Sequence, residues 1–350
     1  MGIRGQSVTL HLLEMVMERG DFANFISDAE ARGRMNRLAA QGTDFVFVID
    51  YPRENCIVLP LDEVDVSQLR FDFPNVGKGV GRGVHDVGEV VWRPAFPPYG
   101  EYERAFRCVK DNILRGNSYL VNLTAKVGLE TNLSLGGIFR RSVAPYRLWL
   151  KDRFVCFSPE TFVRISSAGV ISSFPMKGTI DASVPDAAAV LESDEKEAAE
   201  HATIVDLIRN DLSIVAGGVR VKRYRYVEAI ETNRGRILQT SSEVEGRLAG
   251  GWQGRVGDIV FSQLPAGSIT GAPKPETVRI IAEAENYKRG FYTGVMGCYA
   301  GGALDSAVMI RFVENCGGKL FFKAGGGITS KSECKKEYNE IKQKVYVPFC

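Results

Sequence analysis

Carboxylates on the buried face of a helix are the first candidates for chemistry in this sequence. Residues 185–218 are rich in Ala, Glu and Leu and predict one long helix, on which Glu200 shares a face with Ile204 and Leu207. A carboxylate near the core needs a cation, a proton or a metal ion. For Glu200 the choices are a place at the rim, an ion pair with Arg209 or another cation, or a metal ion.

A second pair of carboxylates lies near the C-terminus. The segment from Ser332 onward predicts a helix whose apolar stripe is flanked by Glu337 and Glu340, with Lys344 four residues after Glu340. One interpretation is ordinary pairing between residues i and i+4. The other is that two carboxylates from two helices bind Mg²⁺, which accepts few protein oxygens and keeps waters that a substrate can displace.

Two small-residue segments could contact a ligand. A predicted strand runs into Gly325, Gly326 and Gly327, and a turn at these glycines would either be purely structural or present backbone N–H groups to an anion. Residues 264–274, with two prolines and several hydroxyls, predict a rigid polar loop that includes Thr270.

Lys177 follows a predicted strand and precedes Gly178 and Thr179. The side chain is either solvated or buried. A buried lysine can act as a nucleophile if its pKa falls from about 10.4 towards neutrality.

The elements that must position these residues indicate an α+β fold. Strand-like runs at 45–50 and 56–60 flank a predicted hairpin turn, and a helix is expected at 101–115. Strands and helices do not alternate regularly, which argues against a parallel α/β sheet. The proline-rich stretch 92–98 suggests a boundary between a strand-rich portion, 1–98, and a second portion, 99–350.

Composition excludes several classes of protein. The 350 residues are 45% hydrophobic and 25% charged, with a net charge of +2 that gives no basic field for nucleic acid. Three histidines do not favour a histidine-built metal site. Seven cysteines without a CxxC pair are expected to be free thiols in a reducing cytoplasm. The sequence contains no run of about 18 apolar residues, so it predicts no membrane span.

Taken together, these residues resemble the chorismate-utilising enzymes, and within them component I of aminodeoxychorismate synthase. The resemblance runs from about Tyr102 to Val345 and rests on eight motifs in order: GNSYLVNLT (116–124), SPETF (158–162), PMKGT (175–179), AEHATIVDLIRNDL (199–212), LPAGSITGAPK (264–274), MIRF (309–312), AGGGI (324–328) and EYNEIKQK (337–344).

The resemblance implies two packed, largely antiparallel sheets with outer helices and an active site between the sheets. It implies Mg²⁺ bound by Glu200 and Glu340, and Glu160 as the general acid/base. Lys177 would be the nucleophile, and we expect burial and Mg²⁺ to lower its pKa once substrate is bound. The implied substrate-binding residues are Gly178, Thr179, Thr270, Arg311, Gly325, Gly326, Gly327 and Lys344.

Two positions separate the branches of this family. Lys177 matches the aminodeoxychorismate branch, whereas anthranilate and isochorismate synthases carry Ala there. Leu120 stands where isochorismate and salicylate synthases carry a water-activating lysine. Phe174, Gln239 and Cys298 depart from the family pattern, and Gln239 and Cys298 bear on how the substrate ring is positioned.

The resemblance therefore predicts the amination of chorismate to 4-amino-4-deoxychorismate, the precursor of p-aminobenzoate. No glutaminase signature is visible in the sequence, so ammonia is expected from a separate glutamine amidotransferase subunit or from solution. The alternatives are anthranilate synthase component I and a non-catalytic homologue that binds chorismate. Sequence does not settle the oligomeric state or an effector site.

Overall fold

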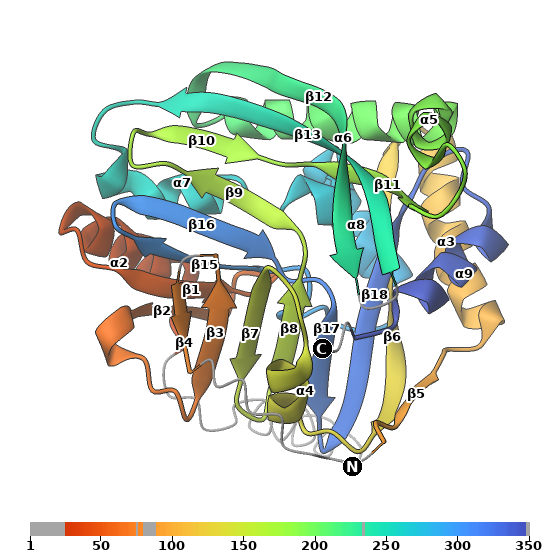
Figure 1. The fold of residues 1–350 in the computed structure, drawn as a ribbon, viewed down its shortest axis with the longest axis horizontal. Helices are drawn as coiled ribbons and strands as arrows, with labels where there is room; N and C mark the ends of the chain where they lie inside the picture. Colours follow the sequence, from red (N-terminus) through yellow and green to blue (C-terminus); the bar gives the residue numbers. More distant parts are fainter. Residues whose placement is uncertain (1–24, 75, 80–88, 233–234, 348–350) are drawn as a thin grey trace, which may run out of the picture.

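Two antiparallel nine-stranded sheets form the protein (Figure 1). The structure is a computed structural model that describes residues 25–74, 76–79, 89–232 and 235–347. Sheet A has the strand order β11 (Met176–Asp181), β13 (Gly235–Leu248), β10 (Val170–Ser173), β9 (Thr161–Ile165), β16 (Ala303–Val308), β15 (Val295–Ala300), β1 (Phe45–Ile49) and β2 (Cys56–Pro60), with β12 (Ala216–Thr232) paired to β13. Sheet B has the order β14 (Gly271–Ala272), β6 (Leu120–Thr131), β18 (Lys319–Ile328), β17 (Phe312–Cys316), β8 (Phe154–Ser158), β7 (Tyr146–Leu150), β3 (Leu69–Phe73) and β4 (Val76–Lys78), with β5 (Trp92–Ala95) paired to β6.

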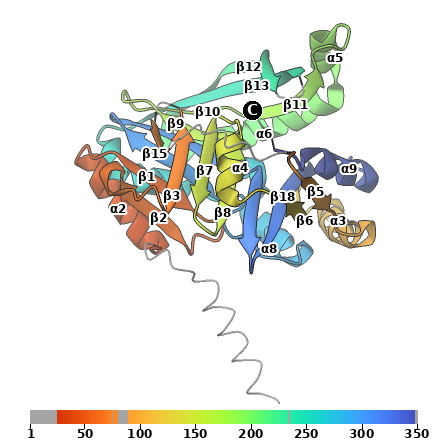
Figure 2. The same cartoon turned by 60° about the horizontal axis from the view of Figure 1, so that its bottom comes forward.

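The helices cover the outer faces of the sheets (Figures 1 and 2). Against sheet A and its neighbouring elements pack α2 (Asp28–Ala40), α5 (Ala187–Ser193), α6 (Glu195–Ser213) and α7 (Val256–Ser262). Against sheet B pack α3 (Tyr99–Leu114), α4 (Leu135–Arg141), α8 (Lys274–Ala284) and α9 (Cys334–Lys344). Three short 3₁₀ helices complete the described elements: η1 (Leu61–Glu63), η2 (Trp252–Arg255) and η3 (Gly267–Ile269).

Alternation along the strands builds separate apolar cores. In β1 every residue is buried, but Phe45 and Phe47 face the helices of sheet A, while Val46 and Val48 face the core between the sheets. Successive strand side chains point to opposite faces, so one apolar run serves two cores. A third core lies between sheet B and its helices.

Two crossovers carry the chain directly from one sheet to the other. Residues 159–160 join β8 of sheet B to β9 of sheet A, and residues 309–311 join β16 of sheet A to β17 of sheet B. The crossovers lie side by side, because the Phe157 amide donates to the Arg311 carbonyl at 3.1 Å and the Val308 amide donates to the Glu160 carbonyl at 3.1 Å. Side chains on them therefore lie between the sheets.

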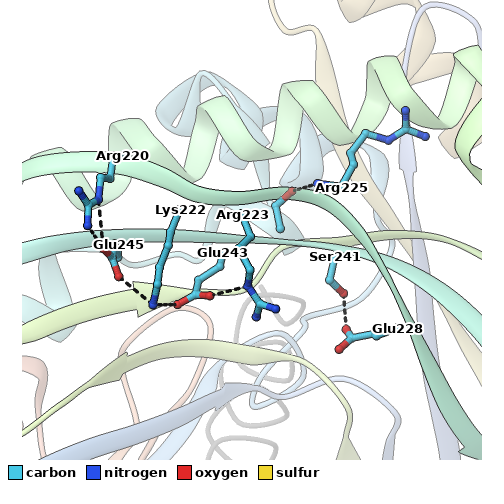
Figure 3. Close-up of polar contacts among 9 residues, drawn as sticks. Arg220, Lys222, Arg223, Arg225, Glu228, Ser241, Glu243 and Glu245 are labelled. Carbon is cyan, nitrogen blue, oxygen red and sulfur yellow. Dashed lines mark hydrogen bonds and ion pairs between the residues drawn. The ribbon is translucent and has the colours of Figure 1, made fainter.

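The long hairpin of β12 and β13 forms one end of sheet A. Figure 3 shows a ladder of ion pairs across it: Arg220 binds Glu245 at 2.7 Å, and Lys222 and Arg223 bind Glu243 at 2.8 and 3.0 Å. The register of the two strands shifts at three places along the hairpin. Bulges of this kind bend a strand. The first half of β13 pairs with β11, and the second half of β13 pairs with β10.

The structure confirms the predicted α+β class with two antiparallel sheets. The hairpin of β1 and β2 and the helix near 101–115, which is α3, are present. The single helix predicted over 185–218 is wrong, because the chain breaks into α5 and α6 at Asp194. The Asp194 side chain accepts the Glu197 amide at 2.9 Å and starts a new helix.

Among the described residues, no helix is both long and apolar enough to span a membrane. The described cysteines form no disulfide bonds.

Candidate active site

A pocket of about 790 Å³ lies between the sheets. Its walls come from β11 and β13 of sheet A, β6 and β18 of sheet B, both crossovers, η3, α6 and α9. Sequence segments far apart in the chain therefore meet around one space. Of the twelve predicted site residues, all except Thr270 line it.

Glu160 and Arg311 enter the pocket from the two crossovers. The Glu160 amide donates to Ser158 Oγ at 3.1 Å, and Ser268 Oγ donates to Glu160 Oε1 at 2.5 Å. Burial raises the pKa of Glu160, against the opposing effects of Ser268 and of the Lys344, Arg311 and Lys177 cations. A carboxyl group with a raised pKa is suited to donate a proton.

Lys177 stands on a β-bulge in β11. The register with β13 shifts between Met176 and Thr179, and Gly178 between them has a φ of +83°, which a residue without a Cβ adopts readily. The bulge points Lys177 into the pocket, where its Nζ lies 2.8 Å from Glu200 Oε2 on α6. The cation that pairs with Glu200 is thus Lys177, whereas Arg209 pairs with Asp206.

The charge around Lys177 is dominated by carboxylates. Burial lowers the pKa of the Lys177 ammonium, but Glu200, Glu197 and Glu340 outweigh burial, so the pKa is raised. The expected lowering of this pKa therefore needs a further positive charge beside these carboxylates.

On α9, Glu340 and Lys344 face strand β18. Lys344 Nζ lies 2.6 Å from Glu340 Oε1 and donates to the Gly325 carbonyl at 2.9 Å. Burial lowers the pKa of Lys344 despite Glu340, and the Arg311 and Lys177 cations add to the lowering. Two pocket lysines thus have pKa values shifted in opposite directions.

The prediction of a turn at residues 325–327 is wrong. These glycines lie inside β18 and pair in regular register with Thr124, Leu123 and Asn122 of β6. At Gly326 the lack of a side chain leaves room next to α9. A Cβ there would lie 3.6–3.7 Å from Glu337 Oε2, Glu340 Oε1 and Lys344 Nζ. The missing side chain keeps the strand surface open beneath the charged residues of α9.

Thr270 does not reach the pocket. It follows η3, is fully buried and lies beside the half-buried Tyr51, whose pKa is raised chiefly by burial. Its neighbours Ser268 and Gly271 line the pocket in its place. The Thr270 assignment is therefore not supported by its position.

Four residues distinguish this chain from other branches or from the usual family pattern, and three of them line the pocket. Leu120, Phe174 and Gln239 line the pocket. Cys298 lies instead in the buried core between the sheets. The departure at Cys298 therefore does not alter the wall of this pocket.

Sequence reasoning missed three groups around the pocket. Ser268 was read only as part of a polar loop. Asp211 and Lys274, which form an ion pair of 2.8 Å at the pocket wall, lie in motifs that were recognised but gave no sign of pairing. The buried pair of Glu285 and Arg289, which contacts the pocket loop through the Ile269 carbonyl, is signalled in the sequence only by its i,i+4 spacing.

The carboxylates fit a hard divalent cation. Glu200 and Glu340 come from two helices, and with Glu197 they surround one lysine whose pKa they raise. Within the described ranges, no three His, Cys, Asp or Glu side chains converge as a metal-binding group. An ion here would accordingly take few protein oxygens and complete its shell with water or substrate, as Mg²⁺ does.

The chain belongs to the chorismate binding enzyme family, whose sequence profile matches residues 88–349. It is 44% identical over 333 residues to an "Uncharacterized PabA-like protein" of Haemophilus influenzae, covering 95% of this chain and 99% of that protein.

More distant relatives come from two branches. Identity is 34% over 256 residues to anthranilate synthase component 1 of Archaeoglobus fulgidus, covering 70% of this chain and 60% of that protein. Identity is 31% over 259 residues to aminodeoxychorismate synthase component 1 of Bacillus subtilis, covering 70% of this chain and 54% of that protein. The crystal structure of anthranilate synthase component I from Streptococcus pneumoniae superposes with a TM-score of 0.62 at 27% identity, covering 74% of this chain and 59% of that one.

The raised pKa of Glu160 gives a prediction for stability. The pKa of Glu160 in the unfolded chain is about 4.3, and its pKa in the folded protein is higher. As pH rises from the unfolded pKa through the folded pKa, this carboxyl therefore makes the fold less stable. Glu160→Gln should therefore melt above the wild type at pH 7, with the gap shrinking towards pH 4. Glu130→Gln, at an exposed position, is the control. Calorimetry showing a lower melting temperature for Glu160→Gln at pH 7 would contradict this.

Proposed function

We propose that the chain is the large subunit of an aminodeoxychorismate synthase, converting chorismate and ammonia to 4-amino-4-deoxychorismate for p-aminobenzoate and folate synthesis. The observation that carries the proposal is the position of Lys177. In a pocket of the chorismate binding family, its amine points inward from the β11 bulge and is within 2.8 Å of Glu200. The alanine of the other branches would offer no nucleophile there.

In the proposed reaction, the residues of this chain divide the work. Arg311 and Lys344 attract the carboxylates of chorismate, for which a cationic pocket wall is suited. The neutral Lys177 Nζ bonds to ring C2, both ring double bonds shift, and the C4–O bond breaks as Glu160 gives its proton to the departing hydroxyl, which leaves as water. Ammonia then bonds to C4, and the C2–N bond to lysine breaks. Two moderate barriers replace one high barrier.

Glu200 and Glu340 are the residues that would hold Mg²⁺. When bound, the ion supplies positive charge for a substrate carboxylate and offsets the carboxylates that raise the pKa of Lys177. The described cysteines of this chain suggest no glutaminase nucleophile, so a glutamine amidotransferase subunit is the proposed source of ammonia.

A second candidate is anthranilate synthase component I, because relatives of that name reach 34% identity. Both candidates use the same pocket and acid. They differ in the carbon that receives ammonia, so the structure of the product separates them.

The first test is the product itself. Incubation of the purified chain with chorismate, Mg²⁺ and ammonium should give the 4-amino product, with a rate that rises with pH because NH₃ and not NH₄⁺ is the nucleophile. Glutamine should serve only when a glutaminase subunit is added. Chromatography with mass spectrometry identifies the isomer. A 2-amino product, no turnover, or glutamine consumption by the chain alone would each refute part of the proposal.

The metal assignment has its own test. Glu200→Gln and Glu340→Gln should raise the Mg²⁺ concentration for half-maximal activity by at least about tenfold, since even indirect partners of a metal ligand are worth that much. Chelator should abolish wild-type activity, and Mg²⁺ should restore it. Glu130→Gln, outside the pocket, should respond like the wild type. Full activity of both variants at low Mg²⁺ would remove these residues from the metal site.

Lys177 is expected to fix the position of amination as well as its rate. With alanine at 177, C2 is open to ammonia, so the residual product of Lys177→Ala should shift towards the 2-amino isomer. Wild-type enzyme trapped during turnover should carry a chorismate-derived adduct on the peptide that contains Lys177. Lys222→Ala, on the exposed hairpin, is the matched control. Unchanged 4-amino product at an undiminished rate would make Lys177 a bystander.

A further inference from the structure

The carboxyl of Glu160 has a dedicated partner that no step above uses. Ser268 Oγ donates to Glu160 Oε1 at 2.5 Å, and Ser268 belongs to η3, which lines the same pocket as the crossover that bears Glu160. The Glu160 backbone is fixed separately, by Ser158 and by Val308. In the part of the chain that the structure describes, this carboxyl accepts a side-chain hydrogen bond from Ser268.

We propose that Ser268 is a positioning residue for Glu160: by occupying Oε1 it leaves Oε2 to carry the proton that the departing hydroxyl of the substrate receives. The inference rests on the proposed function for the role of the proton, and on geometry alone for the contact. A hydroxyl held on one oxygen orients the plane of the carboxyl, which a flexible glutamate would otherwise rotate freely.

Ser268 can orient Glu160 only if η3 is itself held, and a buried ion pair does this. Arg289 Nη1 donates to the carbonyl of Ile269, the residue next to Ser268, at 3.0 Å, and Nη2 donates to the Asn122 carbonyl of β6 at 2.6 Å. Glu285 binds the same guanidinium at 2.6 Å, and both side chains are only 2% exposed. A bidentate, planar arginine is suited to fix two carbonyls at once.

The loop is closed by β6 on its other side. The Asn122 amide donates to the Thr270 carbonyl at 2.9 Å, so Arg289 and β6 hold the consecutive carbonyls of Ile269 and Thr270. This explains why the buried Thr270 matters although it does not reach the pocket. Its backbone, and not its hydroxyl, is part of the support for Ser268.

The surroundings of Glu160 define what removal of the hydroxyl would change. Burial favours the neutral carboxyl, whereas Lys344 from α9, Arg311 from the second crossover, Lys177 from β11 and the Ser268 hydroxyl favour the ionised form. Loss of the Ser268 donor therefore raises the pKa of Glu160. Since the acid must be protonated to act, the fall of kcat at alkaline pH should move to higher pH.

The test compares Ser268→Ala and Ser268→Cys, which lose the strong donor, with Ser268→Thr, which keeps it. Ser262→Ala is the matched control, because this serine lies in α7, outside the pocket. Its hydroxyl donates to the Ile259 carbonyl and accepts from Gln263 Nε2, and so makes no hydrogen bond to Glu160. We expect kcat to fall by about ten- to a hundredfold in the Ala and Cys variants, as for loss of a hydrogen bond to a charged group. KM for chorismate should change less than about threefold, and Thr should restore kcat.

A second readout needs no turnover. Infrared difference spectra against Glu160→Gln report the protonation of the Glu160 carboxyl, and its titration midpoint should rise in Ser268→Ala and Ser268→Cys but not in Ser268→Thr or Ser262→Ala. The Cys variant, nearly isosteric, carries the comparison if Ala perturbs folding. An unchanged midpoint, or an equal loss of kcat in Ser262→Ala, would overturn the proposal. Failure of the proposed function would show instead as absence of the 4-amino product in the wild type.

Discussion

Two backbone hydrogen bonds between the crossovers are the constraint on which the site depends. They tie residues 157 and 308 to residues 311 and 160, at the point where the chain passes from one sheet to the other in each direction. A crossover leaves its backbone without the regular ladder of a sheet, so buried polar groups there must find partners elsewhere. Here the strand that enters each crossover donates an amide to a carbonyl of the other crossover. The acid and the arginine of the pocket are thereby fixed relative to both sheets.

The electrostatics of the pocket follow from the meeting of helices α6 and α9, which both carry carboxylates into it. Carboxylates of α6 and α9 converge on Lys177 and raise its pKa, while Lys344, deeper among other cations, has its pKa lowered by burial first. Groups of the same type are thus given different properties by position alone, which is the usual way in which a site separates its roles. In this pocket the excess of carboxylate around Lys177 is the feature that makes a divalent cation chemically reasonable.

Local features were predictable from sequence, and their assembly was not. The β1–β2 hairpin and α3 follow from short-range patterns and were confirmed. The glycines 325–327 were misread because a glycine run indicates a turn when its neighbours are unknown; only the packing of α9 over β18 shows that they leave space. Asp194 was passed over as a helix start because Ala and Glu continue on both sides of it.

The site residues show the same division. Glu160, Lys177, Glu200 and Glu340 were singled out by motif, and the structure brings them to one pocket. Ser268 and Arg289 escaped attention, since their importance lies in what they touch across 108 and 20 residues of sequence, respectively. The family resemblance implies substrate contact for Thr270, but this side chain, which follows η3, is fully buried and does not line the pocket.

The strand that bears Lys177 has an unusual place in its sheet. Among the described strands, β11 pairs with β13 alone, whereas β15 lies between β1 and β16. Half of the amide groups of an edge strand have no strand partner, and such segments open locally at a smaller free-energy cost than global unfolding. Amide hydrogen exchange in β11 should accordingly be faster than in β15. The fraction of molecules in which β11 is paired and holds Lys177 in the pocket is then set by a local opening equilibrium. This equilibrium is separate from the global stability of the two-sheet core.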